Sequence, residues 1–209
     1  MSFMLKDFSL LIGLFSTTML SAQTELKVNT VFIPMGIYNV GIEKPINPKV
    51  SLQAEVFVSP WKSFLGKNLQ MYMGTLEGRY YFKETGNKWY VGTYLSMAAF
   101  NLQKWNYWSK TTVEDENGNP ELLSDGSVRV TERYQKGLAF IWGVSGGYHF
   151  MLDKKWGLDV FAGVGFTQSL YKGYMEDNNE RYDGATKWNK SGELIPTRAG
   201  VMLTYKLEK

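Results

Sequence analysis

Hydrophobic and polar residues alternate with a period of two along much of the chain, most regularly in residues 137–171. In the first half of this stretch one face carries Leu138, Phe140, Trp142, Val144, Tyr148 and Phe150. In the second half one face carries Leu158, Val160, Ala162, Val164, Phe166 and Leu170. The opposite faces are small or polar, as at Gly143 and Thr167. Because successive side chains of a strand point to opposite faces, this pattern predicts two long strands joined by a turn at residues 153–155.

The same alternation predicts further strands on both sides of this stretch. They cover residues 26–32, 38–43, 50–59, 69–82, 89–101 and 196–207. Turn-forming residues near Pro34, Asn47 and Glu84 separate the early strands. Predicted loops cover residues 60–68, 103–136 and 172–193, and within the second of these residues 111–113 and 127–131 could pair as a hairpin. The chain therefore holds about eight strands, a number whose closed barrel is just filled by its own side chains.

Two orientations of such a barrel satisfy the alternation. A soluble, lipocalin-like barrel turns its apolar faces inward, whereas a membrane barrel turns them toward lipid. The strands in residues 137–171 are long enough to cross a bilayer, which takes about 9–11 tilted residues. Short turns at one rim and longer loops at the other, after the third, fifth and seventh strands, are typical of outer-membrane barrels. We therefore expect an all-β fold, an eight-stranded antiparallel up-and-down transmembrane β-barrel.

The N-terminus has the features of a secretory signal peptide. Lys6 supplies the positive start, residues 8–20 are mostly apolar, and residues 21–23 form a plausible cleavage region. The alternative is a permanent anchor, but the apolar run is short for a spanning helix of about 20 residues. The sequence thus predicts a signal peptide over residues 1–22 and one barrel domain over residues 23–209, placed in a Gram-negative outer membrane after processing.

Composition limits the chemistry that this chain can perform. The 209 residues carry a net charge of +3, which is too small to indicate nucleic acid binding. The absence of cysteine excludes disulfides and thiolate metal sites, and a single histidine argues against zinc. We therefore expect neither a metal nor another cofactor.

If the apolar face meets lipid, the other face fills the interior of the barrel. That face would carry the charged residues Lys27, Glu43, Glu55, Glu77, Arg79, Asp159 and Arg198. Unpaired charge in a narrow barrel is very costly, so these groups must pair or hold water. The near balance of acids and bases favours a salt-bridged plug over an ion path or a proton relay.

His149 is the one residue that could support hydrolytic catalysis, in a triad with a serine and an acid. Ser145 lies on the same face of the same strand, four residues from His149. Two residues of a strand already span about 6.6–6.8 Å, so these two side chains are too far apart to bond. Ser51 and Ser96 on other strands remain open alternatives. We expect no catalytic site.

Aromatic residues are expected to form belts at the two membrane interfaces. The periplasmic belt would hold Tyr80, Tyr81, Phe82, Trp89, Tyr90, Tyr148, Phe150, Trp156 and Tyr205, and the outer belt Trp61, Tyr72, Trp105, Tyr107, Trp108, Tyr134 and Tyr171. Trp105, Tyr107 and Trp108 are also the candidates for outer-loop contacts, because such rings stack on glycans. The acidic residues of the outer loops fit no calcium-binding spacing.

Several short motifs resemble a known family. They are residues 27–29, 39–43, 76–81, 143–148, 156–159, 163–165 and 196–200. In this order they resemble the Bacteroidetes proteins grouped as domain of unknown function 3575. The resemblance implies an outer-membrane barrel of the small OmpA-like class, and it implies no reaction.

We therefore expect a small outer-membrane barrel with a plugged polar lumen, acting as a non-enzymatic structural or surface-interaction protein. The alternatives are a barrel enzyme that modifies lipid or lipopolysaccharide, and a narrow channel. The expected partners are membrane lipids, lipopolysaccharide, the barrel-assembly machinery and an extracellular ligand of the outer loops.

Overall fold

The computed structural model describes residues 24–103, 110–115, 117–182 and 187–207. These residues form an antiparallel sheet and one short 3-10 helix, η1 (Ile33–Met35). The strands are β1 (Glu25–Asn29), β2 (Tyr38–Pro45), β3 (Val50–Phe64), β4 (Lys67–Tyr81), β5 (Lys88–Gln103), β6 (Lys110–Thr112), β7 (Val130–Met151), β8 (Trp156–Met175) and β9 (Asn189–Lys206). None of the described residues form a helix long and apolar enough to cross a membrane.

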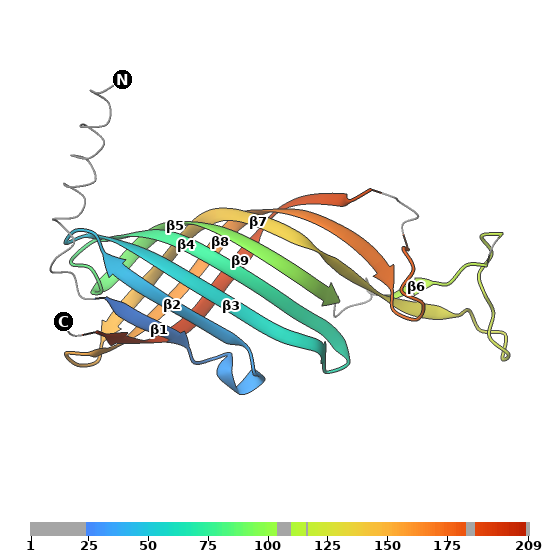
Figure 1. The fold of residues 1–209 in the computed structure, drawn as a ribbon, viewed down its shortest axis with the longest axis horizontal. Coiled ribbons are helices and arrows are strands. Elements are labelled where there is room, and N and C mark those ends of the chain that lie inside the picture. The colour runs from blue at the N-terminus through green and yellow to red at the C-terminus, as the bar shows by residue number, and fades with distance from the viewer. Residues whose placement is uncertain (1–23, 104–109, 116, 183–186, 208–209) are drawn as a thin grey trace, which may run out of the picture.

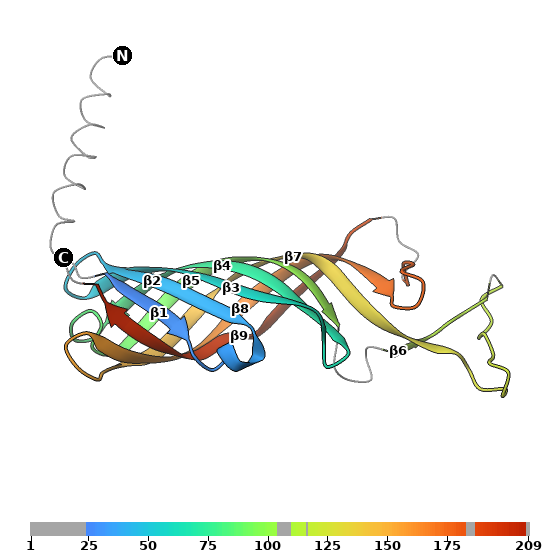
Figure 2. The same ribbon diagram turned by 60° about the horizontal axis from the view of Figure 1, so that its bottom comes forward.

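Eight of the strands close into a barrel. Each pairs with its neighbour in the chain, β5 pairs with β7, and β1 closes the ring by pairing with β9. β6 is the exception, a short strand that pairs with the first residues of β7, Val130 to Glu132. Figures 1 and 2 show the tilted strands around one axis, with the start of β1 and the end of β9 at the same end. The predicted eight-stranded antiparallel fold is confirmed.

Connections differ in length between the two ends of the barrel. At the end where β1 begins and β9 ends, which we call the turn end, residues 46–49, 82–87 and 152–155 join the strands. At the opposite end, which we call the loop end, residues 104–129 and 176–188 form long excursions, the first of which includes β6. The predicted hairpin near residues 111–113 and 127–131 is present, because Thr112 pairs with Val130 and Leu122 bridges to Val128.

The predicted loop over residues 60–68 is wrong. β3 continues to Phe64 and β4 begins at Lys67, so that only Leu65 and Gly66 form the turn. Both turn residues have positive φ, 49° and 78°, the combination that a two-residue type I′ hairpin requires. The third connection is therefore short, and the length asymmetry rests on the last two connections at the loop end.

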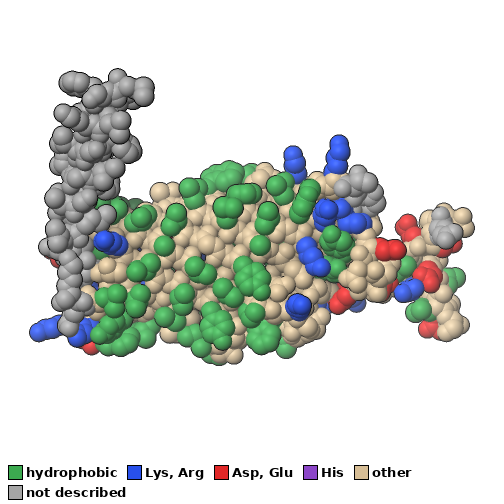
Figure 3. All heavy atoms as spheres, in the orientation of Figure 1, with side chains coloured by type: hydrophobic (Ala, Val, Ile, Leu, Met, Phe, Trp, Pro, Cys, Tyr) green, Lys and Arg blue, Asp and Glu red, His purple; other side chains and the backbone are tan. Residues whose placement is uncertain are grey.

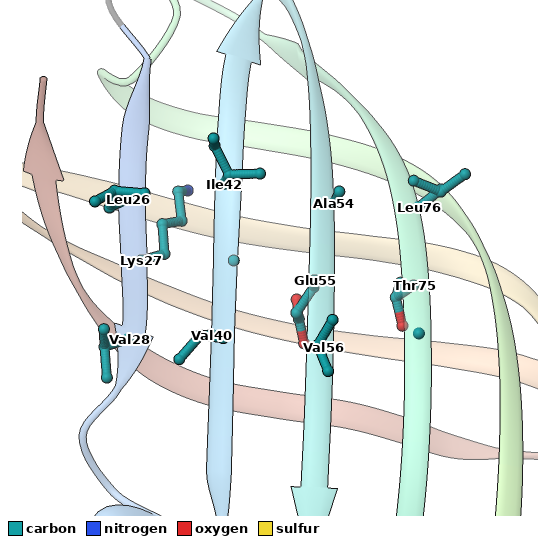
Figure 4. A pocket seen from close by; sticks show the side chains of 12 residues that line it. Leu26, Lys27, Val28, Val40, Ile42, Ala54, Glu55, Val56, Thr75 and Leu76 are labelled. Carbon is teal, nitrogen blue, oxygen red and sulfur yellow. The ribbon is translucent and has the colours of Figure 1, made fainter.

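The large apolar side chains point away from the barrel interior. Leu76, Leu95 and Val144 are each more than half exposed. Figure 4 shows the alternation across β1 to β4, with Leu26, Ile42 and Val56 on the outer wall and Lys27 and Glu55 on the inner side. Figure 3 shows apolar side chains spread over the visible wall of the barrel, with charged groups concentrated toward its ends. The fold thus has a polar interior and an apolar exterior.

Two of the aromatic residues predicted for the periplasmic belt lie inside the barrel instead. Tyr81 and Tyr90 are fully buried, and with Phe161 and Met202 they form a small apolar cluster at the turn end. The period of two explains the error, because Tyr81 shares a face with Arg79. Other members of that belt are exposed near the turn end, namely Tyr80, Phe82, Trp89, Phe150 and Trp156.

Candidate functional site

The seven charged residues predicted for the interior all lie there, buried and close together. They come from six strands: Lys27 from β1, Glu43 from β2, Glu55 from β3, Glu77 and Arg79 from β4, Asp159 from β8 and Arg198 from β9. Each of their side chains is at most 5% exposed. Period-two alternation places them on one face of each strand, and closure of the ring brings those faces together.

Two cations and two carboxylates form the half of this network nearer the turn end. Lys27 Nζ lies 2.7 Å from Asp159 Oδ2 and also pairs with Glu43. Arg79 Nη1 lies 2.6 Å from the same Asp159 oxygen and 3.2 Å from Glu43 Oε2. The four groups therefore form a closed cycle in which each cation contacts both acids, tying opposite walls of the barrel together.

Hydroxyl groups complete the shell of these two carboxylates. Tyr81 donates to Glu43 Oε1 at 2.8 Å, and Tyr90 donates to Asp159 Oδ1 at 2.8 Å. Ser51 also donates to Glu43. The guanidinium of Arg79 lies over the Tyr90 ring, 4.4 Å from its centroid. The attraction within a buried ion pair offsets the cost of desolvation only when further hydrogen bonds satisfy the charged groups, and the three hydroxyls supply such bonds to both carboxylates.

Glu77 links this cycle to a third cation nearer the loop end. It accepts from Arg79 Nε at 2.9 Å, and its Oε2 lies 3.1 Å from Arg198 Nη1. Arg198 also pairs with Glu55, which accepts from Asn39 at 2.8 Å and from Gln53 at 3.0 Å. The network is thus continuous from Lys27 on one side to Glu55 on the other.

Gly92 provides the space for this packing. A Cβ atom at Gly92 would lie 2.6 Å from Ser145 Oγ and 2.7 Å from Glu77 Oε1, whereas at Gly74 it would meet no atom within 4 Å. Sequence reasoning assigned Tyr81 and Tyr90 to the periplasmic belt, although the alternation places them, like Gly92, on inward faces. Only the fold shows which groups these three residues touch.

His149 is buried at the turn end, apart from the serine hydroxyls considered above. Its Nδ1 lies 3.9 Å from Glu25 Oε2. Ser145 donates to Glu77, Ser51 donates to Glu43, and Ser96 bonds to Thr75 at 2.8 Å. The three hydroxyls are therefore engaged with partners other than the imidazole.

Acidic side chains of the long loops mainly organise their own backbone. Asp115 accepts the backbone N–H groups of Asn119 and Asn117, both at 2.9 Å, and these bonds hold the pKa of its carboxyl below the usual value. Arg129 pairs with Glu121 and with Asp177 of the next loop. Among the described residues no cluster of three or more potential ligands could hold a metal. The contact candidates Trp105, Tyr107 and Trp108 and the predicted signal peptide lie outside the described residues.

Comparison with protein families gives a match over most of the chain. The model of the family described as "Protein of unknown function (DUF3575)" matches residues 7–207. No curated protein and no solved structure matches the chain. The match confirms the family part of the resemblance and does not test its Bacteroidetes or OmpA-like part.

Proposed function

The chain belongs to the DUF3575 family, and we propose that it is a small outer-membrane β-barrel that acts without catalysis as a structural or surface-interaction protein. In this proposal the turn end faces the periplasm and the loop end faces the medium. The chain reaches its place after removal of the predicted signal peptide, with the help of the barrel-assembly machinery.

The observation that carries the proposal is the combination of an apolar outer wall with an interior of paired charges. Outward residues of β7 remain apolar from Leu138 to Phe150, with the small Gly146 among them. This stretch measures about 40 Å along the strand, or roughly 30 Å along the axis at a tilt of about 40°. An apolar band of about that height is what the hydrocarbon core requires. In a water-soluble barrel this large apolar surface would be exposed to water.

The outer wall also offers shallow apolar grooves for lipid chains. Ala54 and Gly74 are small outward residues, and the groove above them has a volume of about 620 Å³. Its walls include Leu26, Val56 and Leu76 (Figure 4). Acyl chains are a suitable filling for this space, which supports contact with lipid.

The ion-pair network supports a lumen that does not conduct. Lys27 and Arg79 join β1 and β4 to β8 through Asp159, across the interior. Ions could pass only if these pairs separated, which would leave charges buried without partners. The proposal therefore assigns the function to surfaces outside the lumen. The long excursion around β6 extends beyond the barrel at the loop end (Figure 2) and is the natural contact surface.

Conductance in planar lipid bilayers tests the closed lumen. We expect purified protein to give no sustained open-channel steps, because the interior pairs fill the pore. A heat-dependent shift in gel migration of the same sample would show that the barrel was folded, and co-flotation of the protein with lipid vesicles would show that it had inserted. A stable conductance that changes in the Glu77→Gln variant would contradict the proposal and favour the narrow channel.

A further inference from the structure

A row of polar and basic side chains crosses the outer wall of the barrel near the loop end. Gln70 pairs with Asn101, Asn101 pairs with Lys136, and Lys136 pairs with Lys172 on four successive strands of the sheet. Lys62 on β3 and Trp188 beside β9 border the same groove, whose volume is about 650 Å³. We call this set the lysine row.

The lysine row lies directly beside the apolar wall. The neighbouring outward row consists of Tyr72, Ala99, Leu138 and Leu170, two residues closer to the turn end on each strand. Two residues of a strand cover about 6.6–6.8 Å. Figure 3 shows Lys and Arg side chains gathered on this part of the wall, next to apolar side chains. In the proposed orientation the lysine row therefore lies at the level of the outer headgroups.

Lys136 and Lys172 are held in place by aromatic rings. Lys136 Nζ lies 5.0 Å from the ring centroid of Tyr134 and 5.6 Å from that of Tyr174. Lys172 Nζ lies 5.1 Å from the ring centroid of Trp188. These cation–π contacts orient both ammonium groups over the groove and leave N–H donors available to an anion.

The positive charge of the row is not neutralised within the described part of the chain. Among the described residues no carboxylate pairs with Lys62, Lys136 or Lys172. The nearest acid toward the loop end of β7, Glu132, is engaged by Lys67. Like charges directly opposite each other on neighbouring strands are destabilising, and Lys136 and Lys172 are such a pair. An anion bound between them would remove that repulsion.

We propose that the lysine row binds the phosphate group of an outer-leaflet glycolipid of the lipid A class. The ammonium groups would bind the phosphate, Gln70 and Asn101 would donate to sugar or phosphate oxygens, and the apolar row below would contact the acyl chains. This assignment rests on the proposed placement in the outer membrane and names a lipid and a site for it.

Native mass spectrometry of the detergent-solubilised full chain tests the assignment. Wild type, the Lys136→Gln/Lys172→Gln variant and a Lys83→Gln/Lys154→Gln control would each receive phosphorylated lipid A or its dephosphorylated form. Lys83 and Lys154 are exposed lysines at the turn end. Loss of two charge-assisted contacts corresponds to about a tenfold change in retention. We expect wild type and control to retain the phosphorylated form about tenfold better, and the Lys136→Gln/Lys172→Gln variant to lose this preference.

Three outcomes would overturn the lipid site. These are equal retention of both lipid A forms by wild type, an unchanged preference in the Lys136→Gln/Lys172→Gln variant, and displacement of the lipid by inorganic phosphate at matched concentration. The last would assign the row to free phosphate. Gel migration with and without heating, run on every sample, separates the two proposals. A heat-shifted wild type without phosphate preference overturns the lipid site alone, whereas a wild type without a heat shift overturns both.

Discussion

Arg79 illustrates how single residues determine the interior of this barrel. Its guanidinium contacts Glu43, Glu77 and Asp159 and is fully buried. Replacing a whole buried ion cluster by apolar groups can be neutral, but removing one partner leaves the others charged and unpaired. Replacement of Arg79 should therefore remove a cation contact from more carboxylates of the network than replacement of Lys27 or Arg198 would.

The Arg79→Met variant should lower the free energy of unfolding by about 3–5 kcal/mol, because three carboxylates lose a cation in the buried interior. Urea-induced unfolding of the barrel in lipid vesicles, followed by tryptophan fluorescence, would measure this loss.

Arg129→Met is the matched control for that experiment. Arg129 also pairs with two carboxylates, Glu121 and Asp177, but its side chain is 40% exposed. Exposed pairs contribute about 0–1 kcal/mol, so the control should unfold nearly as the wild type does. Equal losses in the two variants would mean that burial does not set the strength of the Arg79 contacts.

The sequence identifies the interior residues but not their partners. Period-two alternation is local, and it places Lys27 and Asp159 on inward faces without reference to each other. Their contact joins positions 132 residues apart and depends on the closure of the sheet. The same alternation would have placed Tyr81 and Tyr90 inside, had their aromatic character not suggested a membrane interface.

At the scale of elements, the hairpin between β3 and β4 departs most from the prediction. Residues 60–68 contain Pro60, Gly66 and Asn68, which together favour a loop. In the structure Pro60 pairs with Gln70, and Trp61 Nε1 donates to Met35 O at 2.8 Å. Contact with the neighbouring connection thus extends the strands beyond what local residue preference indicates.

Leu65 has positive φ in this turn, which is unfavourable for a side chain other than Gly, Asn or Asp. The Leu65→Asn variant should therefore raise the free energy of unfolding, by up to about 1 kcal/mol, because Asn-Gly is the preferred pair for a type I′ turn. The urea midpoint in vesicles would measure the gain.

Leu65→Ile is the companion variant at the same turn. It keeps the hydrophobic volume and adds a β-branch that positive φ disfavours, so it should lower the midpoint. A decrease in stability of the Leu65→Asn variant would contradict the type I′ geometry of this turn.

At the scale of the whole molecule, the central claim is that the apolar wall faces lipid while the loop end faces the medium. The alternation and the loop lengths lead to this expectation from sequence alone. The eight-stranded ring, closed by the pairing of β1 with β9, and the paired interior agree with it in physical terms, because the barrel places its polar groups together and its apolar groups outside. What the sequence could not provide is the lysine row, since the alignment of its members depends on the register between β4, β5, β7 and β8.

Gel migration of the protein from purified outer membranes, compared before and after boiling and with protease added to intact cells, tests this claim most directly. We predict a shift on boiling and cleavage confined to residues 104–129 and 176–188, because the strands are protected by the bilayer. A protein that stays in the soluble periplasmic fraction and shows no shift would contradict the claim, and the exposed apolar wall would then need a different partner.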